Sequence, residues 1–539
     1  MDKNKKYIYR SILFQHLDGI VITPVLSCLY KQNIINYILV KKNFTLNDLE
    51  SNFKVNLGYL NISLRLLASQ GFLIQKNHKN YNNIAFKITK LGKQFFKDLK
   101  IYSLFFNLLP DLIKFDEFIL KNNAVKFIAD IKNILILLDE EKNKLITSNN
   151  IADSRKITHL EGFLIGPILV SFTINELFPK NMLKEKKINF QEIKGNRAVI
   201  KLVIVFLEKL KWITNISNKE YQISDKGLFF FKRATSYGVT VSYLPTFLNI
   251  DDLIFGNPNI LWKRTSNGME THVNRSMNVW GSGGAHKLYF KKIDDIIIDI
   301  FNKPIEKQPK GISDMGCGDG TMLKHLFDII KNKTIRGKHL DKYPIKVVGA
   351  DFNKAAREAS RKTLFNAEID HLILHGNISE PSNYAYNVKE KLGINLKELL
   401  NVRSFLDHNR IYTIPKNNFF HLKCNSTGAF AFRGRMIPNN ELKQNLIEHF
   451  ESWSPYISKY GLLILELHTI DPLIASKNIG KTIATAYDAT HGFSDQYIFE
   501  INTVQDAAKK AGLTPKLKFQ SNFPRGDAPT ISINLYVSS

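Results

Sequence analysis

The chain has few cysteines and no long apolar run. Only three of its 539 residues are cysteine, namely Cys28, Cys317 and Cys424, and they lie far apart. No C-x-x-C pair occurs, so the sequence indicates neither a disulfide framework nor a cysteine-rich zinc site. The charged N-terminus is not followed by an uninterrupted run of about 18 apolar residues, so we expect no signal peptide, no membrane partner and a cytoplasmic location.

Acidic residues are also scarce: 49 Asp and Glu stand against 75 Lys and Arg, for a net charge of +26. Such an excess suits nucleic acid, an anionic surface or an acidic protein partner. The lysines are spread along the chain rather than gathered in blocks, and Lys, Asn and Ile are used heavily throughout. Biased codon composition therefore explains the charge equally well, and both explanations stay open.

A glycine-rich stretch from residue 311 to 326, GISDMGCGDGTMLKHL, organises the rest of the chain. It predicts a strand that ends at Asp314, a tight turn with glycine at 316, 318 and 320, and the start of a helix. Glycine is needed where the backbone turns sharply or approaches a ligand closely, and a helix N-terminus offers free N–H groups. Dinucleotide-binding proteins use a similar turn, so the motif alone is not specific.

Two further strand ends narrow the interpretation. Residues 345–350 predict a second strand that ends in Asp351 and Phe352, and a carboxylate at this place suits a ribose diol. A third strand leads into Asn377 and Ile378, which would meet the amino group and the ring of adenine. The interval between the two acidic residues exceeds the roughly 20 residues of the dinucleotide fold, and the basic insert 331–342 accounts for the excess.

Together these pieces resemble the class I S-adenosylmethionine (AdoMet) methyltransferase family: D-x-G-x-G-x-G, then an acidic strand end, then Asn-Ile. The resemblance implies an α/β, Rossmann-like, seven-stranded domain with AdoMet as cofactor. The cofactor-binding residues that it implies are Asp314, Gly316, Gly318, Gly320, Asp351, Phe352, Asn377 and Ile378. Another Rossmann-like nucleotide binder is the alternative.

The N-terminal half has the pattern of two winged helices. The segments L-L-A-S-Q-G-F-L…F-K-I-T-K-L-G and F-L-E-K-L-K-W-I…Y-Q-I-S-D-K-G read as an internal repeat of helix, strand, polar wing, strand and helix. We therefore predict two mainly helical winged-helix-like domains before the methyltransferase domain. The predicted ranges are 1–100 for the first, 101–158 for a helical connector, 159–250 for the second and 251–539 for the methyltransferase domain.

Winged helices often bind DNA through their third helix. Here that helix, residues 57–67, offers only Arg65 as a cation, so it lacks a face suited to reading bases. In many small-molecule methyltransferases such units dimerise or cover the substrate. We therefore expect no sequence-specific nucleic acid partner, and the arrangement is compatible with a homodimer.

Three segments carry a closer resemblance. They are residues 270–290, 401–410 and 486–497, and the first contains the pattern H-V-x-R…N-V-x-x-S-G-G-A-H…Y-F. They are similar to AdoMet C-methyltransferases of polyketide assembly lines, especially the apratoxin loading-module type. Asn274 departs from the pattern, which has an acid there. The glycines at 281–284 predict a turn between two helices, and His286 and Tyr289, three residues apart, would share a helix face close to the cofactor.

This resemblance implies methyl transfer to the activated carbon of a carrier-bound β-dicarbonyl such as a malonyl thioester. A carbon acceptor must be deprotonated, and its enolate must be stabilised. The predicted strand ends supply Asp407, His408 and His468 as catalytic candidates, although a structural His468 is equally plausible. The loop 486–497 supplies His491 and Gln496.

The family resemblance also implies a mononuclear Fe(II) or Mn(II) site, with His491 and Gln496 as its ligands, since neutral imidazole suits these metals. The alternative is a metal-free general base at His491. Two other functions stay open: a small-molecule O- or N-methyltransferase, and a winged-helix regulator whose methyltransferase domain senses a ligand.

Overall fold

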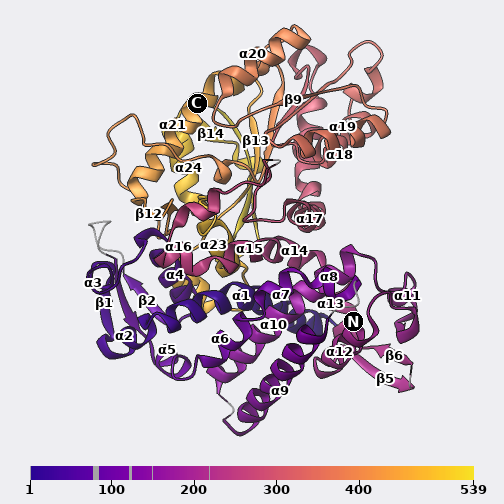
Figure 1. The fold of residues 1–539 in the computed structure, drawn as a ribbon. Coiled ribbons are helices and arrows are strands. Elements are labelled where there is room, and N and C mark those ends of the chain that lie inside the picture. The colour runs from indigo at the N-terminus through magenta and orange to yellow at the C-terminus, as the bar shows by residue number, and fades with distance from the viewer. Residues whose placement is uncertain (1, 77–83, 121–123, 149, 218, 267) are drawn as a thin grey trace. The chain divides into compact units, whose positions relative to one another are not determined.

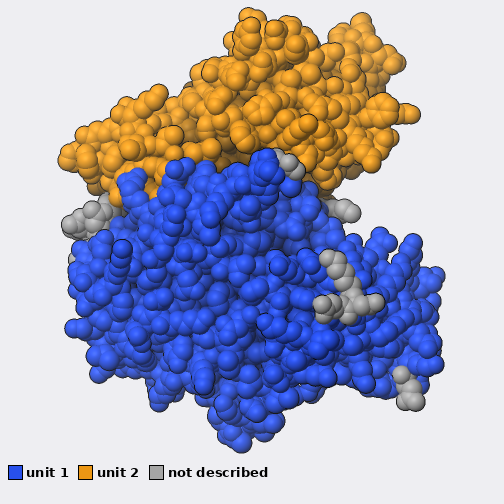
Figure 2. All heavy atoms as spheres, viewed as in Figure 1, with its two compact units in different colours: residues 1–285, 433–436, 472–494 blue, residues 286–432, 437–471, 495–539 orange. Residues whose placement is uncertain are grey.

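The computed structural model describes residues 2–76, 84–120, 124–148, 150–217, 219–266 and 268–539, without the side chains of residues 284–288. The chain forms two compact units (Figure 2). The first unit comprises residues 1–285, 433–436 and 472–494, and the second comprises residues 286–432, 437–471 and 495–539. Residues 472–494 thus follow a strand of the second unit in sequence but fold with the first.

The second unit contains a mixed sheet with the strand order β14-β16-β13-β10-β7-β8-β9, and β15 pairs with β16 (Figure 1). Five neighbouring strands are parallel, namely β9, β8, β7, β10 and β13, and β16 is antiparallel to β13. The strands are β7 (Gly311–Met315), β8 (Lys346–Asp351), β9 (His371–His375), β10 (Leu400–Ser404), β13 (Leu462–Leu467), β14 (Leu513–Pro515), β15 (Ser521–Phe523) and β16 (Ile531–Ser538). The predicted seven-stranded, Rossmann-like sheet is confirmed, with β15 as an addition.

Apolar strands and amphipathic helices build this sheet. β13 is buried along its whole length, as expected of a parallel strand covered on both faces. Five helices connect the strands: α18 (Thr321–Lys333), α19 (Lys354–Asn366), α20 (Pro381–Leu392), α21 (Asn439–Ile457) and α24 (Ile501–Lys510). Because the parallel strands share one direction, their carboxyl ends meet at one edge, where such sheets bind ligands.

The first unit is built around two long helices, α1 (Lys3–Lys31) and α10 (Ile151–Ile174), which pack against each other. Both are long and apolar enough to cross a membrane by length and composition alone. However, 83% of the most apolar window of α1 and 78% of that of α10 are buried inside the protein. Core helices of a helical domain pass the same test, so the two helices are weak evidence for a membrane span.

Two small antiparallel sheets with the same strand order complete the winged helices. The first has the order β1-β3-β2 and the second β4-β6-β5. The elements are α2 (Ile34–Lys41), β1 (Asn43–Thr45), α3 (Leu46–Asn52), α4 (Leu57–Ser69), β2 (Leu73–Lys76), β3 (Ala85–Ile88) and α5 (Lys90–Phe95) in the first, and β4 (Lys187–Asn189), α12 (Arg197–Lys209), β5 (Ile213–Ser217), β6 (Glu220–Ile223) and α13 (Asp225–Phe231) in the second. Thr89 caps α5 and Ser224 caps α13 in the same way, so the predicted repeat extends to its helix caps.

The remaining α-helices and strands among the described residues are α6 (Lys100–Phe106), α7 (Leu109–Ile113), α8 (Phe115–Leu120), α9 (Val125–Ser148), α11 (Met182–Glu185), α14 (Thr235–Ser242), α15 (Leu244–Leu248), α16 (Ile250–Phe255), α17 (Arg275–Phe301), β11 (Ala431–Phe432), β12 (Arg435–Met436), α22 (Pro472–Lys477) and α23 (Ala484–Gly492). α17 corrects one prediction, because it continues through the glycines at 281–284 instead of turning there. Glycine costs a helix interior only about 1 kcal/mol. Gly281 also allows close packing, since a Cβ there would lie 2.5 Å from the backbone nitrogen of Val239.

Candidate cofactor and methyl-transfer site

The glycine-rich turn joins β7 to α18 at the carboxyl edge of the sheet. The backbone nitrogens of Gly316 and Cys317 donate to the carbonyl of Ala350, at 2.7 and 3.0 Å, which ties the turn to the next strand. Gly316, Gly318 and Gly320 have φ values of 82°, 54° and 80°, in the left-handed region that favours glycine. The predicted strand, turn and helix are therefore all present.

The three glycines differ in what surrounds them. A Cβ on Gly316 would lie 2.8 Å from the side chain of Leu406, and one on Gly320 would lie 2.8 Å from Oγ of Ser360. A Cβ on Gly318 would meet no atom within 4 Å among the described residues. Gly316 and Gly320 therefore serve packing, whereas Gly318 faces open space in which a ligand can approach the backbone.

Two carboxylates lie beside this turn. Asp351 accepts hydrogen bonds from the backbone nitrogens of Gly318, at 3.1 Å, and Asn353, at 2.8 Å. An ionised carboxylate has further acceptor positions, so these bonds are compatible with a ribose diol. Asp314 is 1% exposed, and its Oδ1 has no hydrogen-bond partner among the described residues. Burial and the charge of Asp351 raise the pKa of Asp314 well above its usual value.

AdoMet suits this arrangement chemically. It brings an ammonium group and a sulfonium, which match the buried Oδ1 of Asp314 that has no partner among the described residues, and a ribose, which matches Asp351. The ring of Phe352 is 67% exposed at the end of β8, and its centroid lies 5.3 Å from that of His375. An exposed aromatic ring beside the ribose acid is well placed to cover a base.

The other predicted cofactor residues have more local partners. Asn377 accepts from the backbone nitrogen of Ser379 and donates to Glu380, at 3.0 and 2.9 Å, so its amide is held at the start of α20. Ile378 is buried, and its carbonyl accepts from the indole of Trp453 at 2.8 Å. Contacts of both residues with adenine stay predictions.

Helix α17 carries the last two predicted cofactor residues. The ring of Tyr289 lies 5.2 Å from that of Phe523 and 6.5 Å from that of Phe405. Burial raises the pKa of Tyr289 to about 12, so its hydroxyl stays protonated and able to donate. The side chain of His286 lies outside the described residues.

A buried histidine–carboxylate pair follows β10. Nδ1 of His408 lies 2.6 Å from Oε1 of Glu466, which also accepts from the backbone nitrogen of Leu467 at 2.7 Å. The His408 and Glu466 side chains are 7% and 6% exposed. Leu406, two residues before His408, packs against Gly316. The pair thus lies at the same edge of the sheet as the glycine-rich turn.

Asp407 is held in a different network. Its Oδ1 accepts from Nη1 of Arg403 at 2.5 Å and from Nε2 of His449 at 2.9 Å. Burial alone would raise the pKa of Asp407, but Arg403 and His449 more than offset this effect, and the pKa lies well below its usual range. A carboxylate that binds protons so weakly is a poor general base, so the geometry favours a structural role for Asp407.

His468 is also placed structurally. Its Nδ1 lies 3.0 Å from the carbonyl of Phe499 and its Nε2 lies 2.7 Å from Oγ of Ser532. Burial lowers the pKa of His468 to about 4, so the ring is neutral near pH 7. With both ring nitrogens committed to protein partners, His468 matches the structural alternative that the sequence left open.

His491 lies on helix α23 and not on the loop that the sequence predicted. Its Nδ1 lies 2.8 Å from the carbonyl of Tyr487, so in the neutral ring Nδ1 carries the proton. His491 belongs to the first unit and Gln496 to the second, and the role of the two residues as a metal pair stays a prediction. No group of three or more His, Cys, Asp or Glu side chains suited to a metal occurs among the described residues.

Sequence reasoning missed Glu466, His449 and Arg403. A signal existed for Glu466, because it is the single charged residue in the buried strand LLILEL. An isolated charge in such a strand is buried only when it is paired. His449 and Arg403 gave no comparable signal, since their partner Asp407 is brought to them by the fold.

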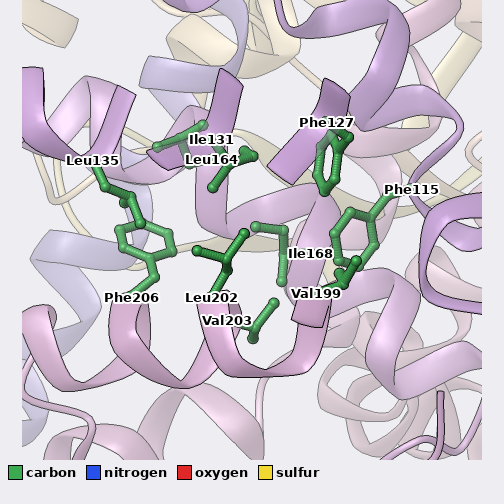
Figure 3. Close-up of a pocket in the computed structure, with 10 residues that line it drawn as sticks. All are labelled: Phe115, Phe127, Ile131, Leu135, Leu164, Ile168, Val199, Leu202, Val203 and Phe206. Atoms are coloured by element: carbon green, nitrogen blue, oxygen red, sulfur yellow. The ribbon is translucent and has the colours of Figure 1, made fainter. Parts of the chain in front are cut away.

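A separate cavity in the first unit is not the site. It lies between α8, α9, α10 and α12, and its side chains point toward one another (Figure 3). The lining residues are Phe115, Phe127, Ile131, Leu135, Leu164, Ile168, Val199, Leu202, Val203 and Phe206. Its volume is about 10 Å³, at the lower limit for one water molecule, and its lining is entirely apolar. It is a packing void.

Comparison with known proteins gives three family matches that cover separate parts of the chain. Residues 270–534 match the AprA MT2-like domain of methyltransferases, residues 9–75 match the AprA N-terminal domain, and residues 161–257 match the AprA winged helix domain. No curated protein sequence matches the chain significantly.

Several solved structures are distantly similar. The mitomycin 7-O-methyltransferase MmcR is 9% identical, with a TM-score of 0.43 over 73% of this chain and 100% of that chain. LepI in complex with SAM is 9% identical, with a TM-score of 0.37 over 75% and 94%. The CurJ carbon methyltransferase is 10% identical, with a TM-score of 0.31 over 76% and 98%. We draw no conclusion from likenesses this distant.

Proposed function

Because this chain is an AdoMet-dependent methyltransferase whose catalytic domain belongs to the AprA MT2-like family, we propose that it methylates an activated carbon. The substrate that we propose is a carrier-bound β-dicarbonyl of the malonyl thioester type, made in polyketide biosynthesis. The sequence motifs of residues 270–290, 401–410 and 486–497 support a carbon acceptor. The structural observation that carries the proposal is the buried His408–Glu466 pair beside the glycine-rich turn.

In this proposal the cofactor is held by the residues around the turn. Gly318 lets the ligand approach the backbone, Asp351 accepts from the ribose hydroxyls, and Asp314 faces the positive end of the molecule. Phe352 covers the adenine. AdoMet supplies an electrophilic methyl group on a sulfonium, which leaves as a neutral thioether.

His408 acts as the general base. Its Nδ1–H donates to Glu466, so Nε2 is the basic nitrogen of the neutral ring. When the C–H bond of the acceptor breaks, its proton passes to Nε2 of His408, and the carboxylate of Glu466 stabilises the imidazolium. The electron pair left on carbon forms the new C–C bond to the methyl group as the S–C bond breaks. The imidazolium then releases its proton to solvent.

His491 is the second proposed catalytic residue. Since its Nδ1 is directed to Tyr487, we assign its Nε2 to proton transfer or to the Fe(II) or Mn(II) that the family resemblance implies. Metal content in the purified enzyme, and turnover with and without a chelator, distinguish these two roles.

We further propose a cytoplasmic enzyme that acts on an acidic carrier protein or a small molecule, and not on DNA. The burial of helix α4 from Gly58 to Ser69 supports this proposal, because a buried helix offers no face to a DNA groove. The net charge of +26 suits an acidic carrier. Dimerisation through the winged helices stays a proposal for sedimentation analysis.

The test of the base uses malonyl-pantetheine as acceptor and labelled AdoMet. His408→Ala should lower turnover by about 10²–10⁴, the usual contribution of a general base. Glu466→Gln should lower it by at least about tenfold, because the neutral amide does not stabilise the imidazolium. AdoMet affinity should not change in either variant.

The matched control is His371→Gln, at the start of β9 and far from the strand carboxyl ends. Exchange of the acceptor C–H in D₂O without AdoMet separates deprotonation from methyl transfer, and His408→Ala should lose this exchange. A His408→Ala enzyme that exchanges and methylates at wild-type rates would remove the base from this proposal.

A further inference from the structure

Helix α4 of the first winged helix is buried by a segment that comes from far along the chain. α4 packs against α22 and α23, which follow β13 in sequence but belong to the first unit. A Cβ on Gly492, at the end of α23, would lie 3.0 Å from Ile62, and the rings of Tyr59 and Phe493 stack 6.0 Å apart. The third helix of this winged helix is therefore a platform for α23.

Two buried polar contacts fix α23 on this platform. Nε of Arg65 donates to Oδ2 of Asp488 at 2.9 Å, and the two side chains are 2% and 4% exposed. Nε2 of Gln70 donates to Oγ1 of Thr485 at 3.0 Å and also to Asp18 of α1 at 2.9 Å. The helix is thus held at two positions that lie three residues apart and so on one face.

His491 extends this pattern by one further turn. It lies three residues after Asp488, on the same helix, and its Nδ1 is directed to the carbonyl of Tyr487. Its ring is flanked by those of Tyr487 and Tyr243, at 5.8 and 6.4 Å. The imidazole is therefore oriented by its own helix, and the helix is oriented by Arg65.

A buried ion pair contributes little net stability compared with apolar residues of similar volume, but in some proteins it specifies one arrangement of the elements that it joins. Arg65, the only cation of α4, forms such a buried pair. A helix that reads DNA would expose its cations instead.

We propose that Arg65 is a positioning residue for methyl transfer: through Asp488 it holds α23 so that His491 is presented in its working orientation. The winged helix is then part of the catalytic scaffold. This inference rests on the proposed function, in which His491 serves the reaction.

The test compares Arg65→Lys and Asp488→Asn with a matched control, Lys156→Met. Lys156 forms another buried pair of the first unit, with Glu141 at 3.6 Å, on helices α9 and α10 and not on α23. Calorimetry gives the AdoMet affinity, and an assay with malonyl-pantetheine gives the turnover. Hydrogen exchange of residues 484–492 reports the local order of α23. Each variant is also combined with His491→Ala.

We expect Arg65→Lys and Asp488→Asn to lower turnover at least tenfold while AdoMet affinity stays within twofold. Amide exchange in α23 should become faster while that of α18 stays the same, and the control should leave α23 unchanged. In the His491→Ala background Arg65→Lys should cause no further loss, because both changes remove the same contribution. If Arg65→Lys does not fold, the milder Thr485→Val takes its place.

The inference would be overturned if amide exchange in α23 stayed at the wild-type rate in Arg65→Lys. It would also be overturned if Arg65→Lys lowered turnover by the same factor with and without His491→Ala. Wild-type turnover of His491→Ala would overturn it together with the catalytic role of His491. A methyl group found on oxygen or nitrogen, with non-additive Arg65 and His491 effects, would instead refute only the carbon acceptor.

Discussion

Replacement of Gly318 by alanine separates cofactor binding from folding. Its φ is 54°, so a Cβ costs about 1–2 kcal/mol of stability through backbone strain alone. No described atom lies within 4 Å of that Cβ, so no steric clash adds to the strain. At Gly316 and Gly320, by contrast, a Cβ would lie 2.8 Å from Leu406 or Ser360, and packing would be disturbed as well.

We expect Gly318→Ala to fold and to bind AdoMet at least tenfold more weakly, a loss of about 1.4 kcal/mol. The methyl group would occupy the space in which the ligand approaches the backbone, and Gly318→Val should cost more. Calorimetric titration gives the affinity, and urea unfolding gives the free energy of unfolding. The matched control is Gly512→Ala. Gly512 has a φ of 75°, lies between α24 and β14, and no described atom would lie within 4 Å of an added Cβ.

The control should lose similar stability and keep its AdoMet affinity. If Gly318→Ala and Gly512→Ala bind AdoMet equally well, the open face of Gly318 is not the cofactor site. If Gly318→Ala loses several kcal/mol of stability, the space around Gly318 is occupied by protein atoms, which contradicts the structure.

Three further predictions concern single residues and one surface. Asp351→Ala should weaken AdoMet binding at least tenfold, measured by the same titration, because the ribose contacts are lost. Burial raises the pKa of Asp18 to about 7, so the folded state favours the protonated carboxyl. The protonated Asp18 therefore stabilises the fold in acid, and this contribution is lost as the pH rises from about 4 to 7. Asp18→Asn should therefore gain stability relative to wild type between pH 5 and pH 8, by up to about 4 kcal/mol in urea unfolding, and an equal difference at both pH values would contradict this. Because α4 is buried, the protein should bind DNA only weakly and lose that binding as salt rises, and a salt-resistant, sequence-selective footprint would favour the regulator.

The features that the sequence predicted correctly depend on local physical chemistry. The turn after Asp314 needs glycine for positive φ, and the strand that ends in Asp351 is a short apolar run, so both are visible in a window of a few residues. The winged-helix repeat was visible because each copy has the same local succession of helix, strand, polar wing, strand and capped helix.

The features that the sequence did not predict depend on tertiary contacts. Helix α17 continues through its glycines because Gly281 packs closely against the backbone next to Gly238, a contact that local propensity does not encode. α23 packs on α4 through Asp488 and Arg65, which lies 423 positions earlier in the chain, so the sequence did not show where His491 is held. For the same reason the pairing of His408, which follows β10, with Glu466 of the neighbouring parallel strand β13 became apparent only in the folded sheet.

The most direct test of the central claim is the position of the transferred methyl group. The enzyme is incubated with ¹³C-methyl AdoMet and malonyl-pantetheine, and the product is examined by carbon NMR and mass spectrometry. We predict a methyl signal at the chemical shift of a methyl group bonded to carbon, which is absent with His408→Ala. A methoxy or N-methyl signal, here or on the enzyme's true acceptor, would contradict carbon methylation.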